Sequence, residues 1–328
     1  MRRKPTMKII ATLAAAGVVA GLTAVPAAAQ FPDRPITWVV PYTPGGITDT
    51  GSRIIAEVLG KELGQTVVVE NRPGAGGMVG TEYVARAEPD GYTILYGTQG
   101  TMAANVSLRK ALKYDPLADF APVHGMGASV NTVVTYADAP YSTIQELVDY
   151  GKAHPGELNF GSAGVGTSTH LSMELFKTIA GIEGLHVPYK GSAPAMNDLL
   201  AGRVDVLFDY PVSSLGHAEA GTLKVLAVNS PERIAILPDA PTLAESGYPD
   251  ATAGSWSMIM VPAGVPEDRM KILADAAEKA IRSDTVKNYY EKYGSTLLLV
   301  KGDAATDFIK AEIDRWADVI ATAGVPKQ

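Results

Sequence analysis

The chain has 328 residues, of which 28 are basic, 35 are acidic and none is cysteine, and its formal net charge is −7. This acidic balance argues against nucleic acid or anionic lipid as a partner, because both call for a basic face. The absence of cysteine excludes disulfides, thiolate metal sites and cysteine nucleophiles. A hydrophobic content of 46% is normal for a globular chain.

The N-terminal 29 residues have the pattern of a secretory signal peptide. Basic residues between positions 2 and 8 precede a charge-free apolar stretch at 9–25, and residues 27–29 are the small residues that signal peptidase requires. An uncleaved membrane anchor is the alternative, although the apolar stretch is shorter than the roughly 20 residues of a typical span. We expect cleavage near Ala29, which removes four basic residues and no acidic one. The mature protein would then be periplasmic, monomeric and not inserted in the membrane, with a net charge of −11.

Short apolar runs alternate with helical patterns in the first part of the mature chain. The sequence predicts strands at 36–40, 66–70 and 92–96, helices at 48–63 and 78–87, and a Pro- and Asp-rich loop at 111–125. Gly64 is the expected C-cap of the first helix. The strand–helix–strand order predicts parallel strands joined by right-handed crossovers.

The alternation resumes after the loop and continues to the C-terminus. Strands are predicted at 131–136, 158–160, 185–188, 204–208, 223–228 and 256–261, and helices at 143–153, 168–180, 193–201, 267–281, 284–293 and 303–322. We predict an α/β fold with two lobes of roughly 150 residues, each a mainly parallel sheet flanked by helices. Lobe 1 would comprise residues 30–131 and 255–328 and lobe 2 residues 132–254, with two crossovers at a hinge.

The first loop of functional interest, residues 41–49, joins a predicted strand to a predicted helix. Its adjacent glycines allow the backbone to approach a ligand, and the free N–H groups at the helix start favour an anion. Thr48 or Asp49 could cap the helix. The candidate ligand-binding residues of this first loop are Tyr42, Thr43, Gly45, Gly46, Ile47 and Asp49.

The second loop, residues 161–170, also joins a strand to a helix and is rich in glycine and hydroxyl residues. Hydroxyls both donate and accept hydrogen bonds, which suits carboxylate oxygens or bridging water. If the two loops lie in different lobes, a bound carboxylate would bridge two helix N-termini and favour closure. The candidate residues of this second loop are Ser162, Ala163, Gly164, Gly166, Thr167 and His170.

Two alternatives to an anion site remain: a purely structural role for the loops, and an enzyme active site. Either loop could be only a tight connection between a strand and a helix. Ser162 and His170 could form the nucleophile–base pair of a hydrolase, although the G-x-S-x-G motif of such enzymes is absent. The glycines at 74–80 follow the second strand with the wrong spacing for a dinucleotide fingerprint, and the histidines show no metal-ligand spacing. We therefore expect no cofactor and no metal.

Two further positions could contribute to a ligand site. Lys190 precedes the predicted helix at 193–201 and could add a cation to the amides of that helix start. Asp209 ends a strand and could accept a hydrogen bond from a ligand hydroxyl or a water.

Several segments, in this order and spacing, resemble the Bug-type receptors of tripartite tricarboxylate transporters. They are residues 41–46 with Asp49, 69–77, 115–116 with 119–123, 161–164 with 166–167 and 170–171, 187–191, 238–242 and 262–264. The resemblance implies a type II periplasmic binding fold and a carboxylate gripped by both loops, partly through ordered water. It also places Thr98 at the border of the cleft and suggests that Ile47 tunes selectivity.

The function that we predict from these observations is capture of a small di- or aromatic carboxylate between two lobes, without catalysis. The resemblance implies delivery to the large and small membrane subunits of a tripartite transporter. Some relatives of this kind act in sensing, so a receptor that signals to a partner protein is the other non-catalytic alternative.

Overall fold

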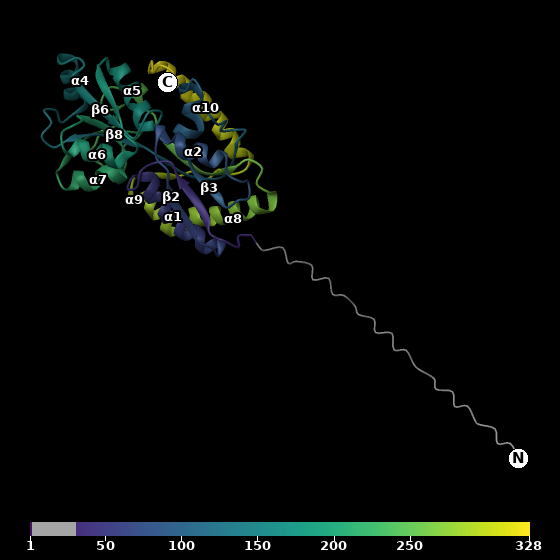
Figure 1. Cartoon of the computed structure of the whole chain (residues 1–328). Coiled ribbons are helices and arrows are strands. Elements are labelled where there is room, and N and C mark those ends of the chain that lie inside the picture. Colours follow the sequence, from purple (N-terminus) through teal and green to yellow (C-terminus); the bar gives the residue numbers. More distant parts are fainter. Residues whose placement is uncertain (2–30) are drawn as a thin grey trace. The chain divides into compact units, whose positions relative to one another are not determined.

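The computed structural model describes Met1 and residues 31–328 (Figure 1). The remainder of the predicted signal peptide lies outside the described residues, as does the predicted mature N-terminus at Gln30. No helix within the described part is both long and apolar enough to cross a bilayer.

The first sheet has six strands in the order β11-β4-β10-β3-β1-β2. β1 (Ile36–Val40) pairs in parallel with β2 (Val67–Asn71) and with β3 (Thr93–Thr98). β10 (Ser255–Pro262) runs antiparallel to both β3 and β4 (Phe120–Ser129), and the short β11 (Thr296–Leu297) closes the edge.

Helices cover both faces of the first sheet. On one face, α1 (Ile47–Leu63), α8 (Glu267–Arg282) and α9 (Asp284–Lys292) share a core with Trp38 and Ile94. The other face is covered by helices packed around the buried side chain of Trp316. These are α2 (Met78–Ala85), the π-helix η2 (Gly100–Ala104), α3 (Asn105–Leu108) and α10 (Asp303–Thr322), with the 3-10 turn η1 (Ala75–Gly77) preceding α2.

The second sheet has five strands in the order β7-β6-β8-β5-β9. β6 (Leu158–Ser162) pairs in parallel with β7 (Gly184–Pro188) and β8 (Val206–Asp209), whereas β5 (Asn131–Tyr136) runs antiparallel to β8 and to β9 (Leu223–Asn229). Its helices are α4 (Ile144–Ala153), α5 (Ser168–Ala180), α6 (Ser192–Leu200) and α7 (Pro211–Glu219), with the 3-10 turn η3 (Pro249–Ala251) after β9.

Both sheets are mixed, so the prediction of mainly parallel sheets is wrong in this respect, although the two-sheet α/β class is confirmed. The chain leaves the first sheet at the end of β4 and enters the second through β5, and it returns through β10. β5 and β10, which carry the chain between the sheets, each pair antiparallel with both of their neighbours, and β4 and β11 also pair antiparallel. The local strand–helix–strand units give the parallel pairs, as expected.

Strand β4 occupies part of the segment that the sequence predicts as loop. Its proline and glycines are poor strand formers, and here they have positional reasons. Pro122 lies beside a register irregularity in the pairing with β10. A Cβ on Gly125 would lie 2.3 Å from the Leu298 carbonyl oxygen, and one on Gly127 would lie 2.1 Å from the Tyr290 ring. Packing from distant residues therefore selects these residues, which local propensity does not reveal.

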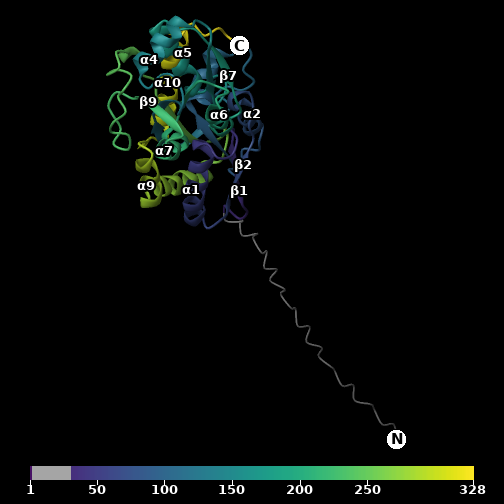
Figure 2. The same ribbon diagram turned by 90° about the vertical axis from the view of Figure 1, so that its left-hand side faces the viewer.

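Helix α5 connects the two sheets through packing. It begins at the end of the loop after β6, yet Leu171 and Leu175 belong to the same buried cluster as Trp316 of α10. The Thr178 hydroxyl also donates a hydrogen bond of 3.0 Å to the Ala323 carbonyl, just after α10. Figures 1 and 2 both show α5 next to the C-terminal end of α10.

Candidate ligand-binding site

A pocket lies where the carboxyl ends of strands from both sheets meet the starts of several helices. It is lined by residues that follow β1, β3, β6, β7 and β8, together with the first residue of β10. None of its fourteen lining residues has a charged side chain. They are Tyr42, Thr43, Gly46, Ile47, Thr48, Thr98, Gln99, Ala163, Thr167, Ser168, Gly191, Ser192, Tyr210 and Ser255.

Four helices of at least nine residues begin at this pocket: α1, α5, α6 and α7. The N-cap residues Gly46 of α1, Gly191 of α6 and Tyr210 of α7 make no side-chain capping hydrogen bond. The first N–H groups of a helix have no partner inside the helix, and the macrodipole adds partial positive charge there. The pocket is thus electropositive because of backbone amides alone, which is the environment that an anion requires.

Two polar atoms in the pocket wall are buried without a hydrogen-bond partner in the described part of the chain. They are the Nε2 amide of Gln99, a residue that is 1% exposed, and the hydroxyl Oγ1 of Thr43. A buried donor without a partner costs about 1–3 kcal/mol. Since both residues line the pocket, a ligand oxygen would remove this cost.

The first loop is held in shape by an ionic contact. The Asp49 carboxylate accepts hydrogen bonds from the Gly45 N–H (3.0 Å) and from Arg53 Nε and Nη2 (3.0 and 2.8 Å). Burial raises the pKa of Asp49, but Arg53, the Gly45 N–H and Asn71 outweigh burial and lower it below the ordinary value. Asp49 is therefore ionised at neutral pH and closes the turn that contains Gly46.

The second loop is held by uncharged groups. The Ser162 hydroxyl lies 2.6 Å from His186 Nε2 and accepts a hydrogen bond from the Gly164 N–H. The Thr167 hydroxyl donates to the Gly164 carbonyl at 2.6 Å, and it also caps α5 by accepting from the His170 N–H. Apart from the imidazoles, which are discussed below, this loop contains no titratable group.

The two loops and their neighbours are in close contact across the pocket. The Thr43 N–H donates to the Lys190 carbonyl at 3.2 Å, and Arg109 Nη2 donates to the Val165 carbonyl at 3.0 Å. A Cβ on Gly76 would lie 2.0 Å from the Val165 carbonyl oxygen, and one on Gly191 would lie 2.1 Å from Thr43 Oγ1. Glycine is required at both places because backbone from one sheet touches residues of the other.

Comparison with known proteins identifies the family. Residues 52–325 match the family model described as the tripartite tricarboxylate transporter family receptor, TctC. The chain belongs to the TctC receptor family. BugT of Bordetella pertussis is 36% identical over 322 residues, which cover 97% of this chain and 99% of that protein.

Solved structures of TctC-like receptors share the fold. The periplasmic binding protein BugD is 36% identical with a TM-score of 0.88, over 91% of this chain and 100% of that chain. The structure described as R. palustris Rpa4515 with adipate is 36% identical with a TM-score of 0.86, over 90% of this chain and 99% of that chain. The predicted family and the periplasmic-binding-protein fold are confirmed, and membership in a receptor family supports the expectation that the protein is not an enzyme.

In this TctC receptor, seven of the residues that the sequence singled out line the pocket: Tyr42, Thr43, Gly46, Ile47, Thr98, Ala163 and Thr167. Eight do not. Of these, Gly45, Asp49, Ser162, Gly164, Gly166 and His170 shape the two loops from behind the pocket surface, as their hydrogen bonds and glycine contacts show. The Lys190 side chain is exposed, and its carbonyl makes the contact to Thr43.

Asp209 lies immediately behind the pocket wall. The carboxyl group is 2% exposed, and its Oδ1 accepts a hydrogen bond of 2.6 Å from the Ser192 hydroxyl. Its other oxygen, Oδ2, has no partner in the described part of the chain. Burial raises the pKa of Asp209 to about 6, although Ser192 and nearby donors lower it. Asp209 thus fixes Ser192 at the start of α6.

The hydrolase pair Ser162–His170 is not formed in this TctC receptor. Ser162 pairs instead with His186, and His170 Nδ1 accepts a hydrogen bond from the Gly166 N–H at 3.3 Å. The two imidazole rings are stacked with centroids 4.1 Å apart. Because Ser162 is only 1% exposed, it is also poorly placed to attack a substrate.

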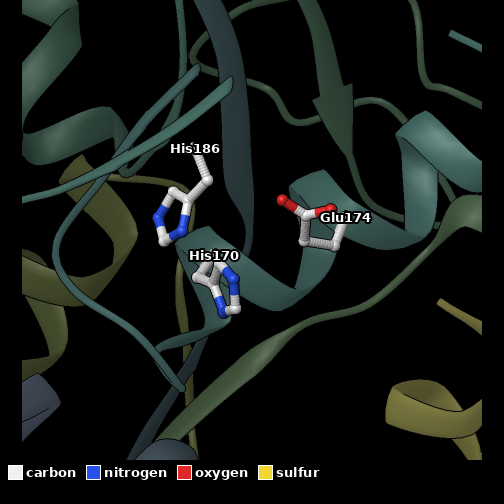
Figure 3. A group of neighbouring side chains, drawn as sticks. All are labelled: His170, Glu174 and His186. Carbon is white, nitrogen blue, oxygen red and sulfur yellow. The ribbon is translucent and has the colours of Figure 1, made fainter. Parts of the chain in front are cut away.

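His170, His186 and Glu174 lie within reach of one another (Figure 3) and could in principle surround a metal ion. Their ligand atoms are largely committed, however. Lys177 donates to both Glu174 oxygens at 3.0 and 3.1 Å, and one nitrogen of each imidazole is bonded to the second loop. Stacked rings also direct their nitrogen lone pairs along nearly parallel planes instead of toward one point. The histidine pair therefore supports the second loop.

The other seven lining residues were not among the predicted ligand-binding residues: Thr48, Gln99, Ser168, Gly191, Ser192, Tyr210 and Ser255. Gln99, Ser192 and Tyr210 each follow a position that the sequence did single out or lie two residues beyond it, and Ser255 begins β10. The sequence feature that could have identified them is their position between the end of a strand and the start of a helix. The absence of charge made them inconspicuous.

Proposed function

We propose that this receptor captures a small organic carboxylate in the pocket between the first and second loops. The observation that carries the proposal is the convergence of four helix N-termini on a pocket with no charged lining residue. Amides and hydroxyls can satisfy a carboxylate without a formal countercharge, because their dipoles are fixed in a desolvated site. The unpaired Gln99 amide supplies a further donor.

The contacts across the pocket support closure around the ligand. Backbone of the second loop and of Lys190–Gly191 meets residues 43 and 76 at van der Waals or hydrogen-bond distance. In the proposed mechanism, residues 30–131 with 255–328 and residues 132–254 form two lobes that separate to admit the ligand. A ligand that touches both loops stabilises the closed form by its differential affinity.

Two neighbours in structure point to the same ligand class. The Rpa4515 structure contains adipate, and another similar structure, MatC, contains malate. Both compounds are small carboxylates. The pocket of this protein, which has the same fold, is rich in the backbone amides that a carboxylate group requires. The sequence resemblance implies the di- or aromatic class within the carboxylates, whereas the uncharged pocket lining by itself requires only one carboxylate.

Isothermal titration calorimetry of the mature protein tests the proposal directly. The panel comprises butanoate, succinate, malate, adipate and benzoate, and butanamide serves as the uncharged counterpart of butanoate. We expect 1:1 binding of at least one acid, and affinity for butanamide at least about 100-fold below that for butanoate, because the helix termini favour the charge. Lack of binding by every acid, or equal binding of amide and acid, would contradict the proposal.

Transport follows as a second part of the proposal. We propose that the protein is exported with cleavage near Ala29, acts as a periplasmic monomer and delivers its ligand to the large and small membrane subunits of a tripartite transporter. Ligand-dependent co-purification with those subunits from membranes would support delivery to the transporter. Co-purification with a sensor protein instead would favour the signalling alternative.

A further inference from the structure

A second pocket lies beside the ligand pocket, next to the first sheet. The two are adjacent, because their linings share five residues: Ile47, Thr48, Thr98, Tyr210 and Ser255. The far end of the second pocket is made by Tyr96 of β3, Ser129 of β4 and Ser257 of β10. All three end in a hydroxyl, and none of the residues that line this pocket carries a charged side chain.

The hydroxyl of Tyr290 is buried next to this far end. The Tyr290 ring packs against Gly127, which lines the pocket, and the residue is 4% exposed. Its hydroxyl has no hydrogen-bond partner within the described residues. Burial raises the pKa of Tyr290, and the hydroxyls of Ser257 and Tyr96 lie near enough to oppose that rise. Tyr96, Ser257 and Tyr290 thus form a cluster of neutral hydroxyls that is not fully paired.

A second negative charge would be costly in this space. Two carboxylates about 6 Å apart repel by roughly 3 kcal/mol at an effective dielectric constant near 20. No cationic side chain lines either pocket to offset that repulsion. Neutral hydroxyls instead match a hydroxyl, carbonyl or amide, because each can both donate and accept.

We propose that the hydroxyl cluster receives the distal end of the ligand, and that this end is an uncharged hydrogen-bonding group. The ligand class is then a monocarboxylate with a hydroxyl, carbonyl or carboxamide at its far end. This inference rests on the proposed function, since it requires the carboxylate to occupy the pocket at the helix starts.

Three acids of equal length separate the possibilities by calorimetry with the mature protein. Butanoate has an apolar end, succinate has a second carboxylate and succinamate has a carboxamide. We expect succinamate to bind about 10-fold or more tightly than either of the others, which corresponds to one or two additional hydrogen bonds. Succinate binding as tightly as succinamate, or butanoate doing so, would overturn the inference while leaving the proposed function intact. Failure of all three acids to bind would overturn the inference, and it would overturn the proposed function as well if malate, adipate and benzoate also fail to bind.

Variants of the cluster test the location. Tyr290→Phe removes a hydroxyl that has no partner, so the variant should fold as stably as the wild type. We expect Tyr290→Phe and Ser257→Ala each to weaken succinamate binding about 5- to 10-fold and to leave butanoate binding unchanged. Tyr293→Phe is the matched control and should change neither, because the Tyr293 ring packs against Tyr289, whereas the Tyr290 ring packs against the pocket residue Gly127. A ratio of succinamate to butanoate affinity that stays constant in both cluster variants would refute the location.

Discussion

The first and second loops do the same work with different chemistry. Each follows a parallel strand, contains at least one glycine with positive φ and leads into a helix whose start lines the pocket. The first loop is held by an ionised carboxylate, Asp49, bonded to Arg53 and to a backbone amide. The second is held by serine, threonine and neutral imidazoles. The common requirement is therefore a fixed backbone path, and the side chains that fix it differ between the loops.

This comparison explains why the charge of nearby side chains does not predict which ligand charge the pocket prefers. Asp49 is negative and close to a pocket proposed to bind an anion, but its charge is used by Arg53 and the Gly45 N–H. The ligand is expected to meet only dipoles. Local dipoles outweigh net charge in a desolvated pocket, which is how an acidic protein can bind an acid.

Keeping the second loop away from residue 76 should have the largest effect. Gly76→Ala places a Cβ 2.0 Å from the Val165 carbonyl, so the closed arrangement cannot form. We expect a loss of ligand affinity of about 100-fold or more, measured by calorimetry with the best ligand of the panel. Gly64→Ala is the control, because it has the same left-handed φ (67° against 66°) but no atom within 4 Å of the new Cβ. Equal losses in the two variants would show that backbone strain, and not contact between the second loop and residue 76, matters.

The second-largest loss of ligand affinity is expected from a change in residues 98–100, which contact both loops. Thr98 is hydrogen-bonded to Tyr42 of the first loop, and a Cβ on Gly100 would lie 2.7 Å from the Gly166 carbonyl of the second. Between them, Gln99 has an unpaired amide, so Gln99→Leu should weaken ligand binding about 10- to 100-fold while leaving the unfolding free energy unchanged or higher. Calorimetry and urea denaturation together test this opposite behaviour. A variant that loses stability but not affinity would place the unpaired amide outside the ligand's reach.

The supports of the two loops should differ in strength. Asp49→Ala removes hydrogen bonds to a charged partner and should lower the free energy of unfolding by about 2 kcal/mol. Thr167→Ala removes an N-cap and should cost about 1 kcal/mol. Asp307→Ala, which breaks an exposed pair with Lys310, is the control and should change little. Urea denaturation at pH 7 measures all three, and a reversed order would contradict the ionic description of the first loop.

The smallest expected effect is a difference in acid sensitivity. Burial lowers the pKa of His170 to about 3 and that of His186 to about 4, so between these values and 6.5 the unfolded chain binds protons that the folded chain does not. Stability of the second loop should therefore fall as the pH drops from 6.5 to 4. The pKa of Asp49 is lowered, so its contribution is present above its ordinary value of 3.8 and is lost only as the pH falls further.

The pH dependence is measured as the difference in unfolding free energy between wild type and His186→Gln. That difference should shrink with acidification between pH 6.5 and 4, because His186 is protonated in the unfolded chain before it is protonated in the folded one. Asp209, with a pKa raised to about 6, contributes stability that declines as the pH rises through this range, and subtraction of the two curves removes its effect. A flat curve for His186→Gln would contradict the role of the imidazole pair.

The fold was largely predictable from sequence, since strand and helix periodicity located most elements to within one or two residues. α7 was not predicted because its segment lacks a clear apolar stripe. β4 was not predicted because its glycines are required by contacts with Tyr290 and Leu298, which are distant in the sequence. The direction of β5 and β10 also escaped, because single-sequence patterns contain no information on strand pairing between distant segments.

The candidate site was predictable in position but less so in its residues. Glycine-rich strand–helix junctions located both loops. At the other junctions, the sequence pointed to a charged residue where its uncharged neighbours line the pocket. Lys190 was predicted, but it is exposed, and Gly191 and Ser192 line the pocket instead. Asp209 was predicted, but Tyr210 lines the pocket in front of it. The electrostatics of the helix starts depend on backbone direction, which a sequence shows only indirectly.

The main-chain character of the proposed grip has a consequence for engineering. A backbone N–H is retained in every side-chain replacement except one by proline, so redesign of the distal pocket should leave the anchoring of the acid group untouched. A library restricted to Tyr96, Ser129 and Ser257 should therefore yield biosensors for different acids that share one closing motion. Such a scaffold separates the choice of analyte from the signal that reports it.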